Sequence, residues 1–376
     1  MTSRERMLTA IWNKKPDMVP VAPDLSNMIP CKLTGKPFWD IYLYEDPPLW
    51  LAYINTVRYF NFDGWFTYGK LQFQYKNDER NFNRRIISRT EERIIELITC
   101  STPKGDLWME RIYYRADPPT DTRKWIKDIR RDFSKLKYFF PEIANYNDEI
   151  FRKQRELLGE DGAFGVTIEV PGIHNLHGWF DGGATSAIFA YYDNYDLIKE
   201  FVEIEEKFIL KKLEMILEAK PDWILIGASG MLTLSSPEIV LDITLPTMKK
   251  ITQMCKEANI PTMLHSCGKE RWLVEIFSNE TDLNSINPLE PPPMGDCNLK
   301  EIKEKFGHKL ALMGNINTSW LLTATPEEVE VVCKQAIEDA GENGGFILST
   351  GDQVGRDTPF ENIRAIINAA RKYGKY

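Results

Sequence analysis

The chain has 376 residues, 43% hydrophobic and 27% charged, which is enough for one barrel-sized domain or two smaller ones. Its formal net charge of −8 argues against a general nucleic-acid surface, and no apolar run approaches the length of a membrane span. The six cysteines show no disulfide-like spacing and the N-terminus shows no signal-peptide pattern, so we expect a cytoplasmic protein.

The first part of the chain alternates less regularly than the rest. A capping box at Thr2-Ser-Arg-Glu5 predicts an N-terminal helix. Apolar runs at Val19–Ala22 and Gly64–Thr67 predict the first two strands. Residues 84–115 predict strands around a turn at Pro103-Lys104-Gly105-Asp106, and this β-hairpin interrupts the strand–helix rhythm as an insertion.

From about residue 160 the sequence alternates between a short apolar strand, a loop rich in Gly, Pro and Ser, and an amphipathic helix. Residues 195–219 have apolar positions at helical spacing. Capping boxes with a proline in the first turn predict helix starts at 235–238, 325–328 and 358–361. The predicted strands are Phe164–Val170, Trp223–Ile226, Thr262–Leu264, Leu283–Ile286, Leu310–Met313 and Phe346–Leu348.

Eight strand–helix units in a chain of this size predict an α/β fold, a (β/α)8 TIM barrel with an N-terminal helical extension and the inserted β-hairpin. No glycine-rich dinucleotide fingerprint follows any strand, which argues against an open doubly wound sheet. No linker or low-complexity stretch divides the chain. Residues 1–376 are therefore predicted to form a single domain, with the insertion at about 84–115.

The active site of such a barrel lies at the carboxyl ends of its strands. His265 and Cys267 follow the predicted strand Thr262–Leu264, and alternation along a strand points these two side chains to the same side. An imidazole and a thiol aimed at one point are suitable ligands for zinc. For this tripeptide alone, a buried thiol beside a hydrogen-bonded histidine is the simpler interpretation. The polar residues that follow the other strands favour the metal site.

A catalytic zinc needs three protein ligands and one open position. Asp352, after the last predicted strand, is our predicted third ligand and a predicted catalytic residue. Glu169 and Glu290 also follow strands and are its rivals. Carboxylates at such positions also cap helices or pair with arginines, and Arg356 is close enough in sequence to compete for Asp352.

Four other residues are predicted to contact substrate. Asp24 and Asn315 follow predicted strands, and His174 and Trp179 lie in a glycine-rich loop that we interpret as a lid or substrate loop rather than a metal site. Most of the aromatic residues between Phe38 and Phe66 are predicted to belong to the core.

Several motifs along nearly the whole chain are shared with one family. They are Arg4-Glu-Arg6, Lys15-Pro16-Asp17-Met-Val-Pro20-Val21, Ser101-Thr-Pro103-Lys-Gly105-Asp-Leu107, His265-Ser-Cys267-Gly268, Asn287-Pro-Leu-Glu290, Leu312-Met-Gly314-Asn315-Ile316 and the tail from Gly351-Asp352 to Asn362. With these motifs the chain resembles the uroporphyrinogen decarboxylase superfamily. Within that superfamily it is most similar to the zinc-dependent corrinoid-protein methyltransferases, and His-x-Cys-Gly is the motif most specific for methyl transfer.

The sequence departs from the family pattern at two positions. The decarboxylases carry an arginine-rich N-terminal motif that holds the carboxylates of their substrate, whereas this chain has Asp24 there and no clustered arginines. The zinc methyltransferases usually have a cysteine after a glycine beyond the last strand, and this chain has Asp352 at that position, which supports Asp352 as a ligand by alignment. One thiolate in place of two gives a harder metal that suits an oxygen-bearing substrate.

The resemblance implies a zinc enzyme that moves a methyl group from a small methylated compound to a corrinoid (cobalamin) carried by a partner protein. A methoxylated aromatic is the favoured donor, as in the first step of O-demethylation. Glu169 would be a dissociable fourth ligand or a proton donor. The alternatives are a metal-free decarboxylase and a non-catalytic protein that binds a corrinoid or tetrapyrrole. The resemblance also suggests a homodimer.

Overall fold

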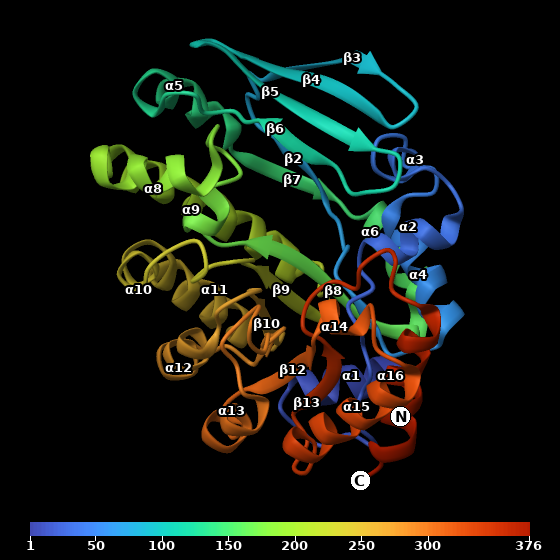
Figure 1. Cartoon of the computed structure of the whole chain (residues 1–376). Coiled ribbons are helices and arrows are strands. Elements are labelled where there is room, and N and C mark those ends of the chain that lie inside the picture. Colours follow the sequence, from blue (N-terminus) through green and yellow to red (C-terminus); the bar gives the residue numbers. More distant parts are fainter.

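Seven parallel strands form the central sheet of the computed structural model, which describes residues 1–376 (Figure 1). Their spatial order follows the sequence, as in a barrel. The strands are β1 (Gly64–Phe66), β8 (Gly162–Glu169), β9 (Trp223–Gly227), β10 (Thr262–His265), β11 (Ser285–Asn287), β12 (Ala311–Ile316) and β13 (Phe346–Thr350). This arrangement confirms the predicted α/β barrel architecture.

Residues 19–22 lie between the two edge strands of this sheet. Val21 forms a parallel bridge with Leu348 of β13, and its carbonyl accepts a hydrogen bond of 2.9 Å from the amide of Asp63, next to β1. The predicted first strand is thus present only as an extended segment with one bridge. Pro20 and Pro23 have no N–H to donate, so a longer ladder cannot form here.

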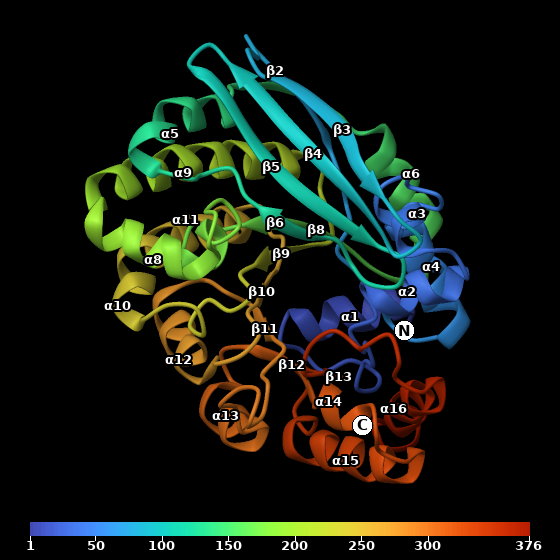
Figure 2. The same ribbon diagram turned by 45° about the horizontal axis from the view of Figure 1, so that its top comes forward.

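Helices surround the strands (Figure 2). The main hydrophobic core lies between these helices and the strands. None of these helices combines the length and the apolar composition that a membrane span requires. The longer helices are α4 (Leu49–Phe60), α6 (Glu149–Leu158), α8 (Gly183–Asp193), α9 (Tyr195–Glu218), α11 (Leu245–Glu257), α12 (Arg271–Glu280), α15 (Pro326–Ala340) and α16 (Phe360–Tyr373). Shorter helices are α2 (Met28–Thr34), α3 (Phe38–Tyr42), α7 (Ile173–Leu176), α10 (Pro237–Ile239), α13 (Leu299–Phe306) and α14 (Thr318–Leu321).

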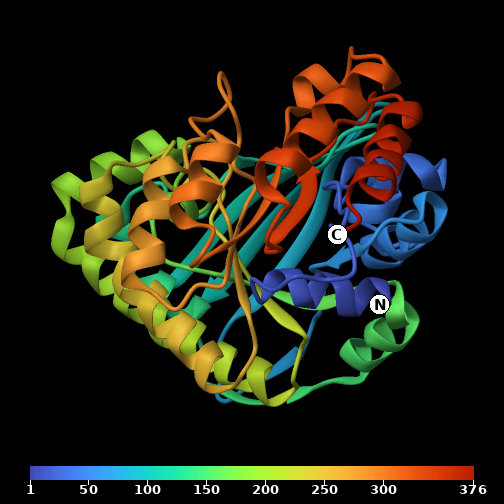
Figure 3. The same cartoon turned by 90° about the horizontal axis from the view of Figure 1, so that it is seen from below.

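Helix α1 (Ser3–Ile11) closes the amino-terminal end of the barrel (Figure 3). Its buried face packs on large side chains from the barrel interior, where the rings of Trp65 and Trp223 stack with centroids 6.0 Å apart. Arg4 holds the helix in place through two hydrogen bonds of 2.8 Å to the carboxylate of Asp222. The filled interior leaves the carboxyl ends of the strands as the place for a site.

The insertion is wider than the predicted hairpin. Strands β3 (Asn81–Arg89), β4 (Arg93–Thr102), β5 (Gly105–Tyr114) and β6 (Thr120–Arg123) form an antiparallel sheet, with β4 and β5 paired around the predicted turn. Strands β2 (Gln72–Tyr75) and β7 (Ile143–Asn147) pair at its base, and α5 (Ile129–Leu136) lies between β6 and β7 in the chain. The four-stranded sheet lies over the barrel (Figures 1 and 2).

Two of the four predicted capping boxes are wrong. The boxes at Thr2 and Thr325 are formed. At the start of α10 the N-cap is Ser236, which makes no side-chain cap hydrogen bond. Helix α16 begins after Pro359, and Thr358 is instead buried in a turn whose amide donates to the carbonyl of Gly355.

Candidate metal centre at the carboxyl ends of the strands

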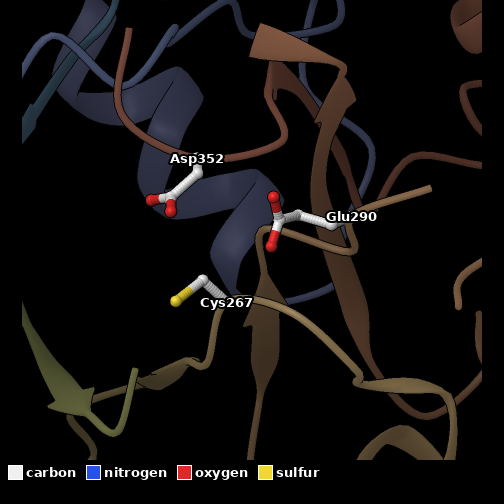
Figure 4. A group of neighbouring side chains, drawn as sticks. All are labelled: Cys267, Glu290 and Asp352. Atoms are coloured by element: carbon white, nitrogen blue, oxygen red, sulfur yellow. The ribbon is translucent and has the colours of Figure 1, made fainter. Parts of the chain in front are cut away.

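Three side chains from three different strand ends converge at the carboxyl end of the barrel. The sulfur of Cys267 and one carboxylate oxygen each of Glu290 and Asp352 all lie within 4.8 Å of one another. The residues follow β10, β11 and β13, and Figure 4 shows their side chains pointing into a common space. Tetrahedral ligands about 2.0–2.3 Å from a zinc ion lie about 3.3–3.8 Å apart, so small side-chain movements would bring these atoms to one ion.

The loop after β10 is shaped to bring Cys267 and Glu290 together. Gly268 has φ +88°, and a Cβ at this position would lie 2.1 Å from the hydroxyl oxygen of Thr233. The amide of Gly268 donates a hydrogen bond to the carboxylate of Glu290. The glycine after the cysteine is therefore required both by the backbone conformation and by the lack of space.

Glu270 supports the site from beneath the Glu290 loop through a backbone hydrogen bond, and it was not predicted from the sequence. Its side chain is fully buried, and one carboxylate oxygen accepts a hydrogen bond from the amide of Leu289, next to Glu290. Its other oxygen has no hydrogen-bond partner. Burial raises the pKa of Glu270 well above its usual value. The neighbours Lys269 and Arg271 make this segment look solvent-exposed in the sequence, so no pattern marks the glutamate as buried.

The three converging residues have no basic partner. Arg356, the predicted competitor for Asp352, pairs with Asp117 at 3.0 Å and with Asp357 at 2.9 Å. Burial, with the charge of Asp352 adding to it, raises the pKa of the Cys267 thiol to about 12. Burial also raises the pKa of Glu290. A cation would compensate the negative charge of these three acidic groups in their ionised forms, so the chemistry of the donor set fits a zinc ion.

His265 and Asp24 lie beside this group. The Nδ1 atom of His265 is buried without a hydrogen-bond partner, and its ring centroid lies 6.5 Å from that of Trp65 in the barrel interior. His265 is outside the set of three converging atoms. Asp24 is buried, and its carboxylate accepts a hydrogen bond of 3.0 Å from the amide of Ser26. Burial raises the pKa of Asp24, and the charge of Asp352 adds to this effect while His265 opposes it.

The structure places the other predicted site residues in supporting or separate positions. Asn315 donates a hydrogen bond of 3.0 Å to the carbonyl of Leu289 and so holds the segment before Glu290. His174 is buried, with Nε2 3.1 Å from the carbonyl of Val170, and burial lowers the pKa of this imidazole to about 4.

Glu169 and Trp179 lie together in a second cavity. The exposed Glu169 carboxylate is 3.5 Å from the ammonium of Lys212, and Glu169 is outside the converging group of three. Trp179 belongs to an aromatic cluster with Phe139 and Phe140. Both Glu169 and Trp179 line a cavity beside helix α9.

Comparison with known proteins identifies the family. The family model for uroporphyrinogen decarboxylase (URO-D) matches residues 181–373, just over half of the chain. The uroporphyrinogen decarboxylase of Mannheimia succiniciproducens is 26% identical over 209 residues, which cover 52% of this chain and 55% of that protein. That of Actinobacillus succinogenes is 29% identical over 138 residues, 36% of this chain and 37% of that protein. The chain thus spans about half the length, or less, of these curated relatives.

A methyltransferase from Methanosarcina mazei has a similar fold, with a TM-score of 0.65, 17% identity and 99% coverage of both chains. At this identity the similarity establishes the fold over the full length. The family model covers more than half of the chain, including the site-bearing strands β10 to β13, and the chain therefore belongs to the uroporphyrinogen decarboxylase family.

Proposed function

We propose that this protein is a zinc-dependent methyltransferase that moves a methyl group from a small methylated compound to the corrinoid of a separate protein. The observation that carries the proposal is the convergence of Cys267, Glu290 and Asp352 without a basic partner. A single thiolate among oxygen ligands favours an oxygen-bearing methyl donor, and a methoxylated aromatic is our preferred class.

Cys267, Glu290 and Asp352 would hold the zinc and leave the fourth position open for the methyl donor. His265, whose Nδ1 atom is buried without a hydrogen-bond partner, lies beside them as an alternative ligand. Bound zinc would polarise the ether oxygen of the donor. The protein contributes the orientation of these side chains: Gly268 fixes the Glu290 carboxylate, and Glu270 fixes the peptide before it. In this proposal Glu169 is not part of the donor set.

The acidic side chains at the carboxyl ends of the barrel strands argue against a decarboxylase that acts on a polycarboxylate. Asp24, Glu290 and Asp352 share this region, and none of them forms an ion pair with a lysine or arginine within 4.0 Å. A substrate carrying several carboxylates would be repelled by these groups unless they are protonated or bound to a metal. The relatives named uroporphyrinogen decarboxylase nevertheless make this reaction the proper comparison in an assay.

The test measures zinc content and methyl transfer in the same preparations. We expect one zinc per chain in the wild type, loss of zinc in Cys267→Ala and Asp352→Asn, and methyl transfer from a methoxybenzene to cob(I)alamin that is lost in parallel. Glu169→Gln is the matched control, because this glutamate also follows a barrel strand but lies outside the donor set. It is expected to keep its zinc.

Each other outcome has a definite meaning. Wild-type protein that transfers methyl groups without bound metal rejects the zinc assignment. Zinc-loaded protein that decarboxylates uroporphyrinogen and transfers no methyl group from methoxybenzenes, methylamines or methanol rejects the methyltransferase. A corrinoid or porphyrin that copurifies with a chain inactive in both assays indicates a binding protein.

A further inference from the structure

A second cavity, of about 240 Å³, lies beside the end of β8 and is separate from the metal centre. Helices α7 and α9 and the segment after α5 contribute its lining. Four aromatic side chains and two glutamates dominate it: Phe139, Phe140, Trp179, Phe208, Glu169 and Glu205. None of the functions proposed above explains this combination of rings and carboxylates.

Glu205 is the buried acid of this cavity. Only 3% of the residue is exposed, and one carboxylate oxygen accepts a hydrogen bond of 2.7 Å from the side-chain amide of Asn175. The second oxygen is buried without any hydrogen-bond partner, although Glu205 lines the cavity. An unpaired buried oxygen of this kind is costly, and a ligand that supplies a positive charge would satisfy it.

Glu169 lies at the exposed side of the same cavity. Its side chain is 54% exposed and pairs with Lys212 at 3.5 Å, so the only lysine of the lining already has an acidic partner. Glu205 has no lysine, arginine or histidine within 4.0 Å. Glu205 is therefore the acidic side chain of this lining that lacks a basic partner, and it is the more deeply buried of the two.

The aromatic rings form the apolar part of the lining. Phe140 lies 5.5 Å from Phe208 at an interplanar angle of 76°, and Phe139 lies 5.4 Å from Trp179 at 84°, measured between ring centroids. Rings set at steep angles to one another form walls rather than a flat stack. The faces of aromatic rings attract cations, and methylated ammonium groups suit such surroundings because they are weakly hydrated.

We propose that this cavity binds a small organic cation with a methylated ammonium group, held by the four aromatic rings and by the Glu205 carboxylate. A cavity of this size accommodates a compact head group rather than a large molecule. A metal cation would need several oxygen ligands, which the aromatic lining does not supply. The assignment is independent of the proposed methyl transfer, because it uses none of the metal donors.

The first experiment compares choline with 3,3-dimethyl-1-butanol, its neutral analogue of the same shape, by titration calorimetry of the full chain. We expect saturable binding of choline and an affinity for the neutral analogue that is lower by about tenfold or more. Absence of saturable choline binding at millimolar concentrations overturns the proposal. Equal affinity for the two compounds also overturns it, since the site would then recognise only shape.

The second experiment uses a matched pair of variants on α9. Glu205→Gln keeps a carbonyl oxygen that can accept from Asn175 and replaces the other carboxylate oxygen with an uncharged NH2 group, so it is expected to weaken choline binding by about tenfold. Glu206→Gln is the control, because the Glu206 carboxylate accepts from Thr247 and Lys250 instead. Trp179→Leu should weaken binding as well. Equal affinities in all variants that unfold at the wild-type temperature reject the site.

The pH dependence provides a third measurement. Burial, with the charge of Glu169 adding to it, raises the pKa of Glu205 to about 8, and Lys212 on the same helix is the other charged group of the lining. Choline should therefore bind more tightly as the pH rises through this value, because the carboxylate becomes ionised. The same titration with Glu205→Gln should be flat, and an unchanged slope in this variant contradicts the proposal.

Discussion

At the scale of single residues, Glu270 is the clearest case of a side chain whose role lies in placing another. It is fully buried, has no basic partner, and accepts the hydrogen bond that fixes the peptide before Glu290. Such a carboxyl is tolerated because one of its oxygens is hydrogen-bonded and because burial raises its pKa, which favours the uncharged form.

This role predicts different outcomes for two substitutions. Glu270→Gln retains a carbonyl oxygen for the Leu289 amide and should lower the free energy of unfolding by less than about 1 kcal/mol. Glu270→Ala leaves that amide unsatisfied and opens a cavity, so a loss of about 2–4 kcal/mol is expected, together with reduced zinc content. Urea unfolding at pH 7 measures the difference. Equal stability of the two variants contradicts the assigned role.

The sequence indicated this region for a physical reason and missed part of it for another. Cys267 and Asp352 were predicted from their places after strands, and the structure brings them together with Glu290, which the sequence offered only as a rival. The sequence does not show that Gly268 turns its amide towards Glu290, because that contact depends on the loop after β10. Side-chain convergence across loops is a tertiary property that spacing along one strand does not encode.

At the scale of elements, the ends of helices give a direct test of local rules. The Thr325 side chain accepts a hydrogen bond from the amide of Glu328, and the Glu328 side chain bonds back to the N-cap amide. Ser236 precedes α10 in a sequence that looks equivalent, yet its side chain makes no such bond. The residues that follow Ser236 form one short turn that continues into a π-helical segment.

The two helix starts should therefore respond differently to alanine. Thr325→Ala is expected to lower the free energy of unfolding by about 1 kcal/mol, since it removes a formed cap. Ser236→Ala should change it by less than about 0.5 kcal/mol. Thermal or denaturant unfolding of the two variants side by side is sufficient. A larger loss for Ser236→Ala would show that the cap is formed there in solution.

The barrel strands could be predicted because they are buried on both faces and read as continuous apolar runs, as β9 and β13 show. The insertion was predicted only in its middle, where β4 alternates between buried and less buried residues. Strand β3 is exposed along its whole length and β6 is the polar Thr-Asp-Thr-Arg. The predicted range 84–115 includes most of β3, whereas β6 lies outside it, because a polar strand of this kind depends on its neighbours in the sheet.

At the scale of the whole molecule, Asp222 joins three distant parts of the chain. Its side chain is 4% exposed and bonds to Arg4 of α1, to Arg155 of α6 and to the amide of Phe164 in β8. Burial acts to raise the pKa of Asp222, but the hydrogen bonds from Arg4 and Phe164 outweigh it, so the pKa lies below its usual value of 3.8.

This depressed pKa predicts a loss of stability in acid. The Asp222 carboxylate stabilises the folded state at pH values above its unfolded pKa, and this contribution disappears as the pH falls through its lower folded pKa. Asp222→Asn should lower stability at pH 7 by about 2 kcal/mol and make the decline below pH 4 shallower. Urea unfolding from pH 7 to pH 3 tests this.

The control for this titration is Glu280→Gln, which removes an exposed partner of Lys249. Its decline in acid should follow that of the wild type, because an exposed pair contributes little. If Asp222→Asn also follows the wild type, the contacts of Asp222 do not govern the acid response of this fold.

Helix α1 and the stacked Trp65 and Trp223 close the amino-terminal end of the barrel. In the proposed function, substrate would reach Cys267 and product would leave it at the carboxyl ends of the strands, because the other end is filled. A product that remains bound at the carboxyl ends of the strands excludes the next substrate molecule, so product inhibition should be competitive with the substrate. Exchange of product for substrate at this end of the barrel, rather than the chemical step, would then limit turnover at high substrate concentration.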